Sequence, residues 1–147
     1  MTAELERIFN QAWVGVADGP LSAPVLGRVV GMLAARADCP IDRLDDALLV
    51  ADAVAAKAAS FSVDHRISAQ IVARMGSVEL QVGPLRDGGA NGLIESAALP
   101  GVGNVLERVA DGLEPCEGDD GEEYLIIRLD FQAQRPATID RMESDVT

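Results

Sequence analysis

Apolar and polar residues alternate most clearly in the middle of the chain. Two runs between residues 66 and 82 have a period of two, with Ile67, Ala69, Ile71 and Ala73 on one side of the first and Val78, Leu80 and Val82 on one side of the second. Met75-Gly76 separates them. The pattern predicts an antiparallel hairpin with one buried face, and Gly83-Pro84 is expected to end its second strand.

The same alternation returns near the end of the chain and is weaker at its start. In residues 123–131 the side chains of Leu125, Ile127, Leu129 and Phe131 share one face. A strand at residues 113–117 and an acidic turn at 118–121 precede this run, so a second hairpin is predicted, with its later strand well paired. Residues 7–16 predict a first strand.

Helical spacing fills the intervening segments. Ser22 is a predicted N-cap for a helix that continues to about residue 37, and Asp42 is a predicted cap for a longer helix that ends near Ser60. In the longer helix one stripe contains Leu44, Leu48, Ala51, Ala55 and Ala58. So many alanines imply close packing on a sheet. Shorter helices are predicted at residues 90–98 and 104–111.

The order of these elements is strand, two helices, hairpin, loop, two helices and hairpin. It predicts an α+β protein, a two-layer α/β sandwich with helices packed on one face of a mostly antiparallel mixed sheet. Residues 1–131 are expected to form one domain. Residues 132–147 have no periodicity and are expected to form a mobile polar tail.

Composition excludes several classes of function. The chain has 147 residues and a net charge of −12, and its twelve basic residues are scattered, which argues against a nucleic-acid partner. No apolar run approaches the roughly 18 residues of a membrane span, and no signal peptide is apparent. A cytoplasmic location is expected. Cys39 and Cys116 have no metal-like spacing and are expected to be free thiols.

The candidate chemistry lies in a glycine-rich segment and on the long helix. At residues 99–111, Gly101, Gly103 and Asn104 form a turn that runs into a helix, an arrangement that presents backbone N–H groups to phosphate. The alternative is a tight turn with no ligand. Asp52 and Ala56 are four residues apart, so they share a helix face. Asp52 is otherwise only a carboxylate at the border of the buried stripe.

With these motifs, residues 5–131 resemble the anti-sigma-factor serine kinases of the GHKL, or Bergerat-fold, ATPase superfamily, which has a histidine-kinase-like ATPase fold. Residues 48–56 are similar to the family's N-box helix, in which an acidic residue precedes a magnesium-holding asparagine by four positions. Asp52 matches the acidic position, but Ala56 replaces the asparagine. Residues 100–106 resemble the second glycine box, which meets the phosphates.

The resemblance also implies an adenine-binding Asp-x-Gly motif after the strand that ends at Val82. In strict register that aspartate falls at Pro84, and only a shift of three residues makes Asp87 and Gly89 the match. The alternative for Asp87-Gly88-Gly89 is an ordinary surface turn. The resemblance thus implies ATP or ADP as candidate ligands. Magnesium is doubtful because the methyl group of Ala56 offers no oxygen.

Three functions follow from the resemblance and its departures. The preferred one is a degenerate regulatory protein of bacterial partner switching, which binds a sigma factor and an anti-anti-sigma protein, forms a homodimer as a further option, and has weak or no ATP binding. The second is an active ATP-dependent serine kinase with Asp52 as catalytic base. The third is a structural domain without ligand. His65 is expected to be solvated, and the sequence offers no hydrolytic triad.

Overall fold

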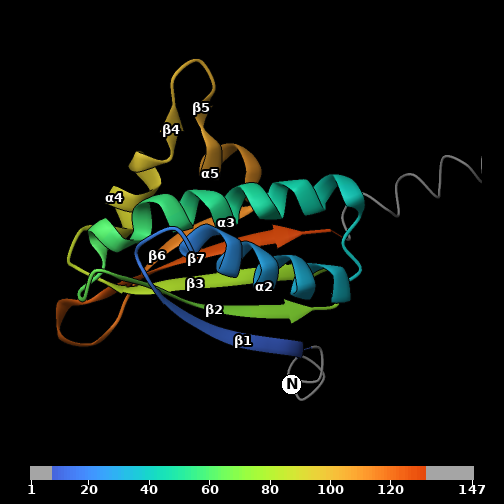
Figure 1. Ribbon diagram of the computed structural model, residues 1–147, viewed down its shortest axis with the longest axis horizontal. Helices are drawn as coiled ribbons and strands as arrows, with labels where there is room; N and C mark the ends of the chain where they lie inside the picture. Colours follow the sequence, from blue (N-terminus) through green and yellow to red (C-terminus); the bar gives the residue numbers. More distant parts are fainter. Residues whose placement is uncertain (1–7, 132–147) are drawn as a thin grey trace, which may run out of the picture.

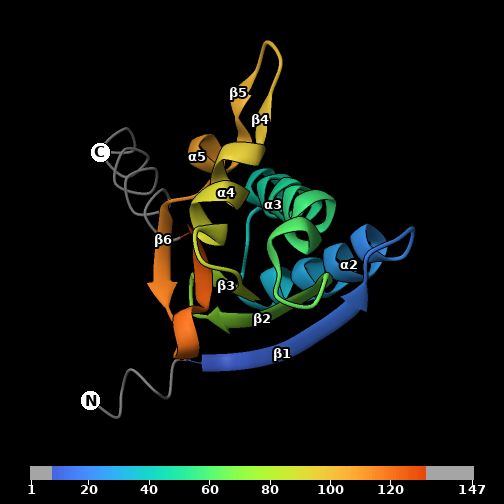
Figure 2. The same ribbon diagram turned by 90° about the vertical axis from the view of Figure 1, so that its left-hand side faces the viewer.

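The chain forms two layers, a curved five-stranded sheet and a set of helices on its concave face (Figures 1 and 2). The computed structural model describes residues 8–131. The strands are β1 (Ile8–Ala17), β2 (Arg66–Arg74), β3 (Ser77–Leu85), β6 (Gly112–Glu117) and β7 (Glu123–Asp130). Their order is β1-β2-β3-β7-β6, and every neighbouring pair is antiparallel. The predicted two-layer α+β class is confirmed, and the described sheet contains no parallel pair.

The helical layer comes from two parts of the chain. The first is α2 (Ser22–Arg36) and α3 (Ile41–Phe61), and the second is α4 (Gly89–Ser96) and α5 (Val105–Val109). Between α4 and α5 the short strands β4 (Ala98–Leu99) and β5 (Gly103–Asn104) pair as a hairpin, which projects away from the sheet (Figure 1). A single 3-10 turn, Asp119–Gly121, connects β6 to β7.

The alternation of apolar and polar residues along the strands determines which side chains of the sheet lie in the core. Ile71, Leu80 and Ile127 lie directly opposite one another on β2, β3 and β7, and all three side chains are fully buried. Side chains that point to the same face of a sheet recur every second residue, so the predicted apolar faces of all three strands lie under the helices. Both predicted hairpins, β2–β3 and β6–β7, are confirmed.

Helix α3 brings small side chains to this surface. Its buried residues are Ala47, Val50, Ala51, Val54, Ala55, Ala58 and Ala59. The three alanines of the predicted stripe are among them, whereas Leu44 and Leu48 are only half-buried at the edge of the contact. Because alanine is short, the helix axis approaches the sheet closely, as its composition predicts.

Both predicted helix caps are wrong. Leu21 precedes the first residue of α2, and the hydroxyl of Ser22 donates instead to the carbonyl of Gly19 at 2.8 Å. Pro40 precedes α3 in an extended conformation, so Asp42 already lies inside the first turn. Neither cap position provides a side-chain hydrogen bond, because a glycine turn leads the chain into α2 and a proline leads it into α3.

The predicted end of β3 at Gly83-Pro84 is also wrong. The strand continues to Leu85 through a cis peptide bond between these residues, and its pairing with β7 shifts between Val82 and Leu85. The irregularity accommodates the proline, which cannot donate to a regular ladder. Gly83 is required there: its φ is +150°, and a Cβ atom would lie 2.7 Å from the ring of Tyr124.

Candidate functional site

Asp52 and Ala56 lie on one exposed face of α3, as predicted, and both line a hollow of about 200 Å³. The other lining residues are Leu49, Ala53 and Lys57 of α3, and Ser96, Ala97, Leu99 and Val105 from the α4–β4 and α5 side. The face of α3 that carries Asp52 therefore lies against the β4–β5 hairpin, which contains Gly101 and Gly103.

The walls of this hollow are mainly hydrocarbon. Asp52 and Ser96 provide its side-chain oxygens, and the hydroxyl of Ser96 already donates to the carbonyl of Leu93 at 2.8 Å. Its volume lies below the roughly 300–1,000 Å³ of typical small-molecule sites. The hollow therefore suits an apolar group of the size of a side chain better than a nucleotide with a chain of phosphates.

The predicted glycine-rich phosphate turn is the end of the β4–β5 hairpin. The N–H of Val102 donates to the carbonyl of Leu99 at 3.1 Å, which closes a turn with Pro100 second and Gly101 third. Gly101 has φ +77°, which a type II turn requires at that position. Gly103 follows and pairs with Leu99. Both glycines are exposed, and the hairpin turn is sufficient to explain why glycine occupies these positions.

Asn104 holds this hairpin in place. Its Oδ1 accepts a hydrogen bond from the N–H of Glu107 at 3.1 Å, and its Nδ2 donates to the carbonyl of Ile94 at 2.7 Å. The residue thus caps α5 and ties the hairpin to α4. Helix α5 spans five residues, and α4 ends at Ser96, so both helices predicted for this segment are shorter than expected. Residues 98–99 and 103–104 pair with each other instead.

Asp87 and Gly89 lie at the far end of α4. The eight residues of α4 separate them from the hollow by about 12 Å. Gly89 packs so tightly that an added Cβ would lie 2.9 Å from the Cβ of Leu85. The structure therefore brings Asp52 toward the hairpin with Gly101 and Gly103, but it leaves Asp87 and Gly89 apart from them.

A residue that the sequence did not indicate occupies the start of α4. The carboxylate of Glu123 on β7 accepts hydrogen bonds from the N–H groups of Gly88, at 2.9 Å, and Ala90, at 3.1 Å. These bonds to the charged form, that of Gly88 first, lower the pKa of Glu123. The only local signal was a glutamate at the beginning of a strand, and its partners lie more than thirty residues earlier in the sequence.

Replacing Glu123 by glutamine is expected to lower stability at neutral pH and to leave little difference in acid. Because the folded-state pKa is depressed, the stabilisation is present above the ordinary glutamate pKa of about 4.3 and is lost as the pH falls through the lower folded value. Thermal unfolding of wild type and Glu123→Gln across this range measures the effect. Glu122→Gln removes the same charge without these bonds, and an equal pH dependence in both variants would contradict the assignment.

The implied magnesium ion does not fit these residues. A hard cation needs several oxygen ligands, and the position that should hold it is the methyl group of Ala56. Over residues 8–131, no group of three or more His, Cys, Asp or Glu side chains is arranged to hold a metal ion. The lining of the hollow therefore offers magnesium one carboxylate, that of Asp52.

The remaining candidates lie elsewhere. His65 is exposed in the turn between α3 and β2, with φ +60°, and so is solvated as predicted. Cys39 and Cys116 are free thiols, as expected. Burial raises the pKa of the Cys39 thiol to about 11, while the nearby charge of Arg43 opposes this shift. The Cys39 thiol is thus a poor nucleophile near neutral pH.

The sequence matches no known protein-family model and no curated protein sequence. Within residues 8–131, no helix is both long enough and apolar enough to cross a membrane. These comparisons therefore add nothing to the motif residues on which the resemblance to the anti-sigma-factor kinases is based. What the geometry defines is a two-layer α+β domain with an apolar hollow between α3 and the β4–β5 hairpin.

Proposed function

We propose that this chain is a regulatory binding domain, a degenerate relative of the anti-sigma-factor kinases that acts by protein–protein contact in the cytoplasm of a bacterium. The observation that carries the proposal is the hydrocarbon hollow at Asp52 and Ala56, where the resemblance would place the metal and phosphates. By the same resemblance, the candidate partners are a sigma factor and an anti-anti-sigma protein. Little or no ATP binding is expected.

Exposed apolar side chains beside the hollow support docking of a protein. Leu49 on α3 is 46% exposed, and Leu99 and Val102 on the hairpin are 50% and 49% exposed. Large apolar groups gathered around a hollow favour association, because a partner that covers them removes apolar surface from water. A partner helix that inserts one apolar side chain between α3 and the hairpin fits this shape.

The charge of the chain favours a basic partner. Its net charge is −12, and because Asp52 and Lys57 both line the hollow, the attraction for a basic partner comes from the chain as a whole. Charge of one sign increases the rate at which an oppositely charged surface is encountered, and the apolar contacts then determine how long the complex lasts. A basic, amphipathic segment of the partner is therefore the proposed ligand of the hollow.

Asp52 also favours the alternative, an ATP-dependent serine kinase. Its carboxylate is exposed in the hollow, where it could orient or deprotonate a serine hydroxyl. This function requires a nucleotide in a space that is small and apolar. Nucleotide binding therefore separates the two proposals.

Introducing an aspartate at Leu49 or Leu99 is expected to weaken partner binding by at least about tenfold, because a charge would be buried in an apolar contact. The measurement is pairwise co-expression with individual sigma factors and anti-anti-sigma proteins of the source cell, followed by titration of the pair that co-purifies. Leu21→Asp is the matched control, since Leu21 is 69% exposed at the start of α2 and does not line the hollow.

Calorimetric titration with ATP and magnesium tests the expectation that the chain binds little or no nucleotide. No saturable binding is expected for the wild type, and tight magnesium-dependent binding would instead support the kinase. Ala56→Asn restores the missing amide. If this variant gains magnesium-dependent nucleotide binding, the alignment of Asp52 and Ala56 with the N-box is supported. If it does not, that alignment loses its support.

A further inference from the structure

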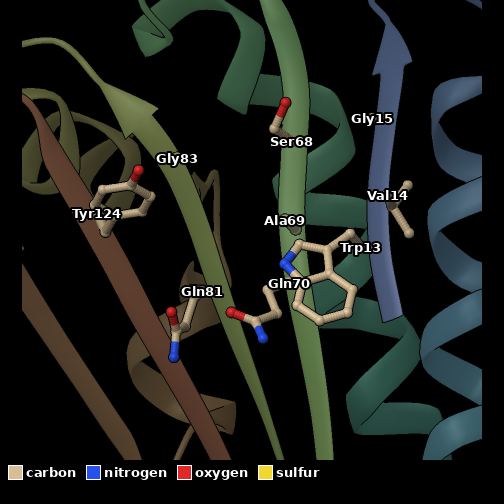
Figure 3. Close-up of a pocket in the computed structure, with 9 residues that line it drawn as sticks. All are labelled: Trp13, Val14, Gly15, Ser68, Ala69, Gln70, Gln81, Gly83 and Tyr124. Carbon is tan, nitrogen blue, oxygen red and sulfur yellow. The ribbon is translucent and has the colours of Figure 1, made fainter. Parts of the chain in front are cut away.

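The open face of the sheet, opposite the helices, carries a second and larger hollow (Figure 3). Its volume is about 470 Å³, within the usual range for ligand sites. It is lined by Trp13, Val14, Gly15, Ser68, Ala69, Gln70, Gln81, Gly83 and Tyr124. The chain contains one tryptophan and one tyrosine, and both line this hollow. Trp13 is 69% exposed, an unusual position for so large an apolar ring.

The register of the strands makes the hollow an elongated one. Trp13 on β1 pairs with Gln70 on β2, which in turn pairs with Gln81 on β3. Gln81 pairs with Ile126 on β7, and Tyr124 lies two residues along that strand, beside Gly83, so its ring and the indole are diagonal to each other and at least three strand spacings, or about 14 Å, apart. Figure 3 shows the two amides between these rings. The short side chain of Ser68 and the lack of one at Gly15 leave space alongside.

No lining side chain carries a charge at neutral pH, although the chain as a whole has a net charge of −12. The nearest acidic group that contacts a lining residue is Glu79, which is paired with Arg74 at 3.3 Å. An ionic ligand would find no counter-charge among the lining side chains. The site therefore fits a neutral ligand with apolar faces for the two rings.

The two glutamines indicate which hydrogen bonds such a ligand must make. Nε2 of Gln81 donates to a carboxylate oxygen of Glu79 at 3.4 Å, and a carboxylate can only accept, so the amide oxygen of Gln81 is left as an acceptor. Nε2 of Gln70 donates to Oε1 of Gln11 at 3.1 Å, and because Gln11 is itself an amide, Gln70 can offer either its oxygen or its N–H group to a ligand. Within residues 8–131 neither oxygen has a hydrogen-bond partner. The prolines of a proline-rich peptide have no N–H group to donate, whereas hydroxyl groups donate through O–H.

We propose that this face binds a neutral oligosaccharide laid across β1, β2, β3 and β7. The C–H faces of two sugar rings stack on Trp13 and Tyr124, and hydroxyl groups between them donate to the oxygen of Gln81 and hydrogen-bond to the amide of Gln70. A single sugar cannot span about 14 Å, so a chain of several units is required. The site lies on the opposite side of the sheet from the hollow at Asp52, and this inference does not rest on the proposed protein partners.

Trp13 is itself the reporter for the test. Cellohexaose, maltohexaose and chitohexaose are titrated separately into the full chain while tryptophan emission is followed, with calorimetry on the same samples. At least one hexasaccharide is expected to give a saturable change, and glucose alone should bind at least about tenfold more weakly. Tyr124→Ala and Gln81→Leu should each weaken binding by about tenfold. Met32→Ala, at an exposed position on α2, should leave it unchanged.

Several outcomes would overturn the proposal. One is no response to any of the three hexasaccharides at millimolar concentration. Another is binding that both Tyr124→Ala and Gln81→Leu leave intact while their circular dichroism matches the wild type. Emission that changes on dilution alone, with a dimer in sedimentation, would assign the face to a second copy of the chain. Tighter binding of decaproline than of every hexasaccharide would assign it to a peptide.

Discussion

Replacing Leu80 with alanine is expected to lower the free energy of unfolding by about 2–5 kcal/mol. Leu80 is fully buried on the central strand β3, directly between Ile71 and Ile127 on the neighbouring strands. Truncation removes methyl groups from the middle of the layer against which the helices pack. The surrounding strands are fixed by their ladders and relax only partly, so a cavity remains. A domain of this size is stable by only about 5–15 kcal/mol, so the loss is a large fraction of the total.

Urea unfolding followed by circular dichroism measures this loss. Leu21→Ala is the matched control, because Leu21 is 69% exposed and its truncation should change stability by less than about 0.5 kcal/mol. A loss below about 1 kcal/mol for Leu80→Ala would mean that Leu80 does not lie in a packed core.

Replacing Arg43 with methionine is expected to cost about 1.5–3 kcal/mol, the second largest effect. The guanidinium donates to Asp46 at 2.7 Å, to Asp111 at 2.5 Å and to the carbonyl of Val109 at 3.3 Å. Its side chain is only 12% exposed. These bonds join the first turns of α3 to the end of α5 at Val109 and to Asp111 in the segment before β6. Methionine keeps much of the hydrocarbon stem but removes the charge and every donor.

A double-mutant cycle separates this role from simple packing. Asp111→Asn removes one of the two carboxylate charges that Arg43 contacts, so the two substitutions should be less than additive, whereas independent effects would add within about 0.5 kcal/mol. Additive losses would contradict the proposed contact. Arg28→Met is the control, since Arg28 lies on the exposed face of α2 and its replacement should be nearly neutral.

The fold was predictable where a period extends over many residues. Alternation in β2, β3 and β7 and the stripe of alanines in α3 each require one particular face to be buried, and these faces meet in the core. The helix caps were not predictable, since Ser22 and Asp42 have the right chemistry one or two residues inside the helix. A cap depends on the path of the preceding turn, which Gly19 and Pro40 determine.

The candidate site was predictable only in part. The shared face of Asp52 and Ala56 follows from helix geometry alone. The role of Gly101 does not, because a phosphate-binding turn and a type II hairpin turn both require glycine with positive φ. The bond from Asn104 to Ile94 fixes the hairpin, and only the folded chain brings the two together. The contacts of Glu123 with the start of α4 were unpredictable for the same reason.

The two outer strands of the sheet differ in their protection against aggregation. Along β6 the free edge contains a proline, Pro115, and acidic side chains at Glu114 and Glu117, features that discourage another chain from pairing there. Strand β1 is ten residues long and contains neither a proline nor a charged residue. Strand addition by a neighbouring molecule is therefore expected to begin at β1. A lysine introduced on that strand should reduce aggregation of the protein at high concentration.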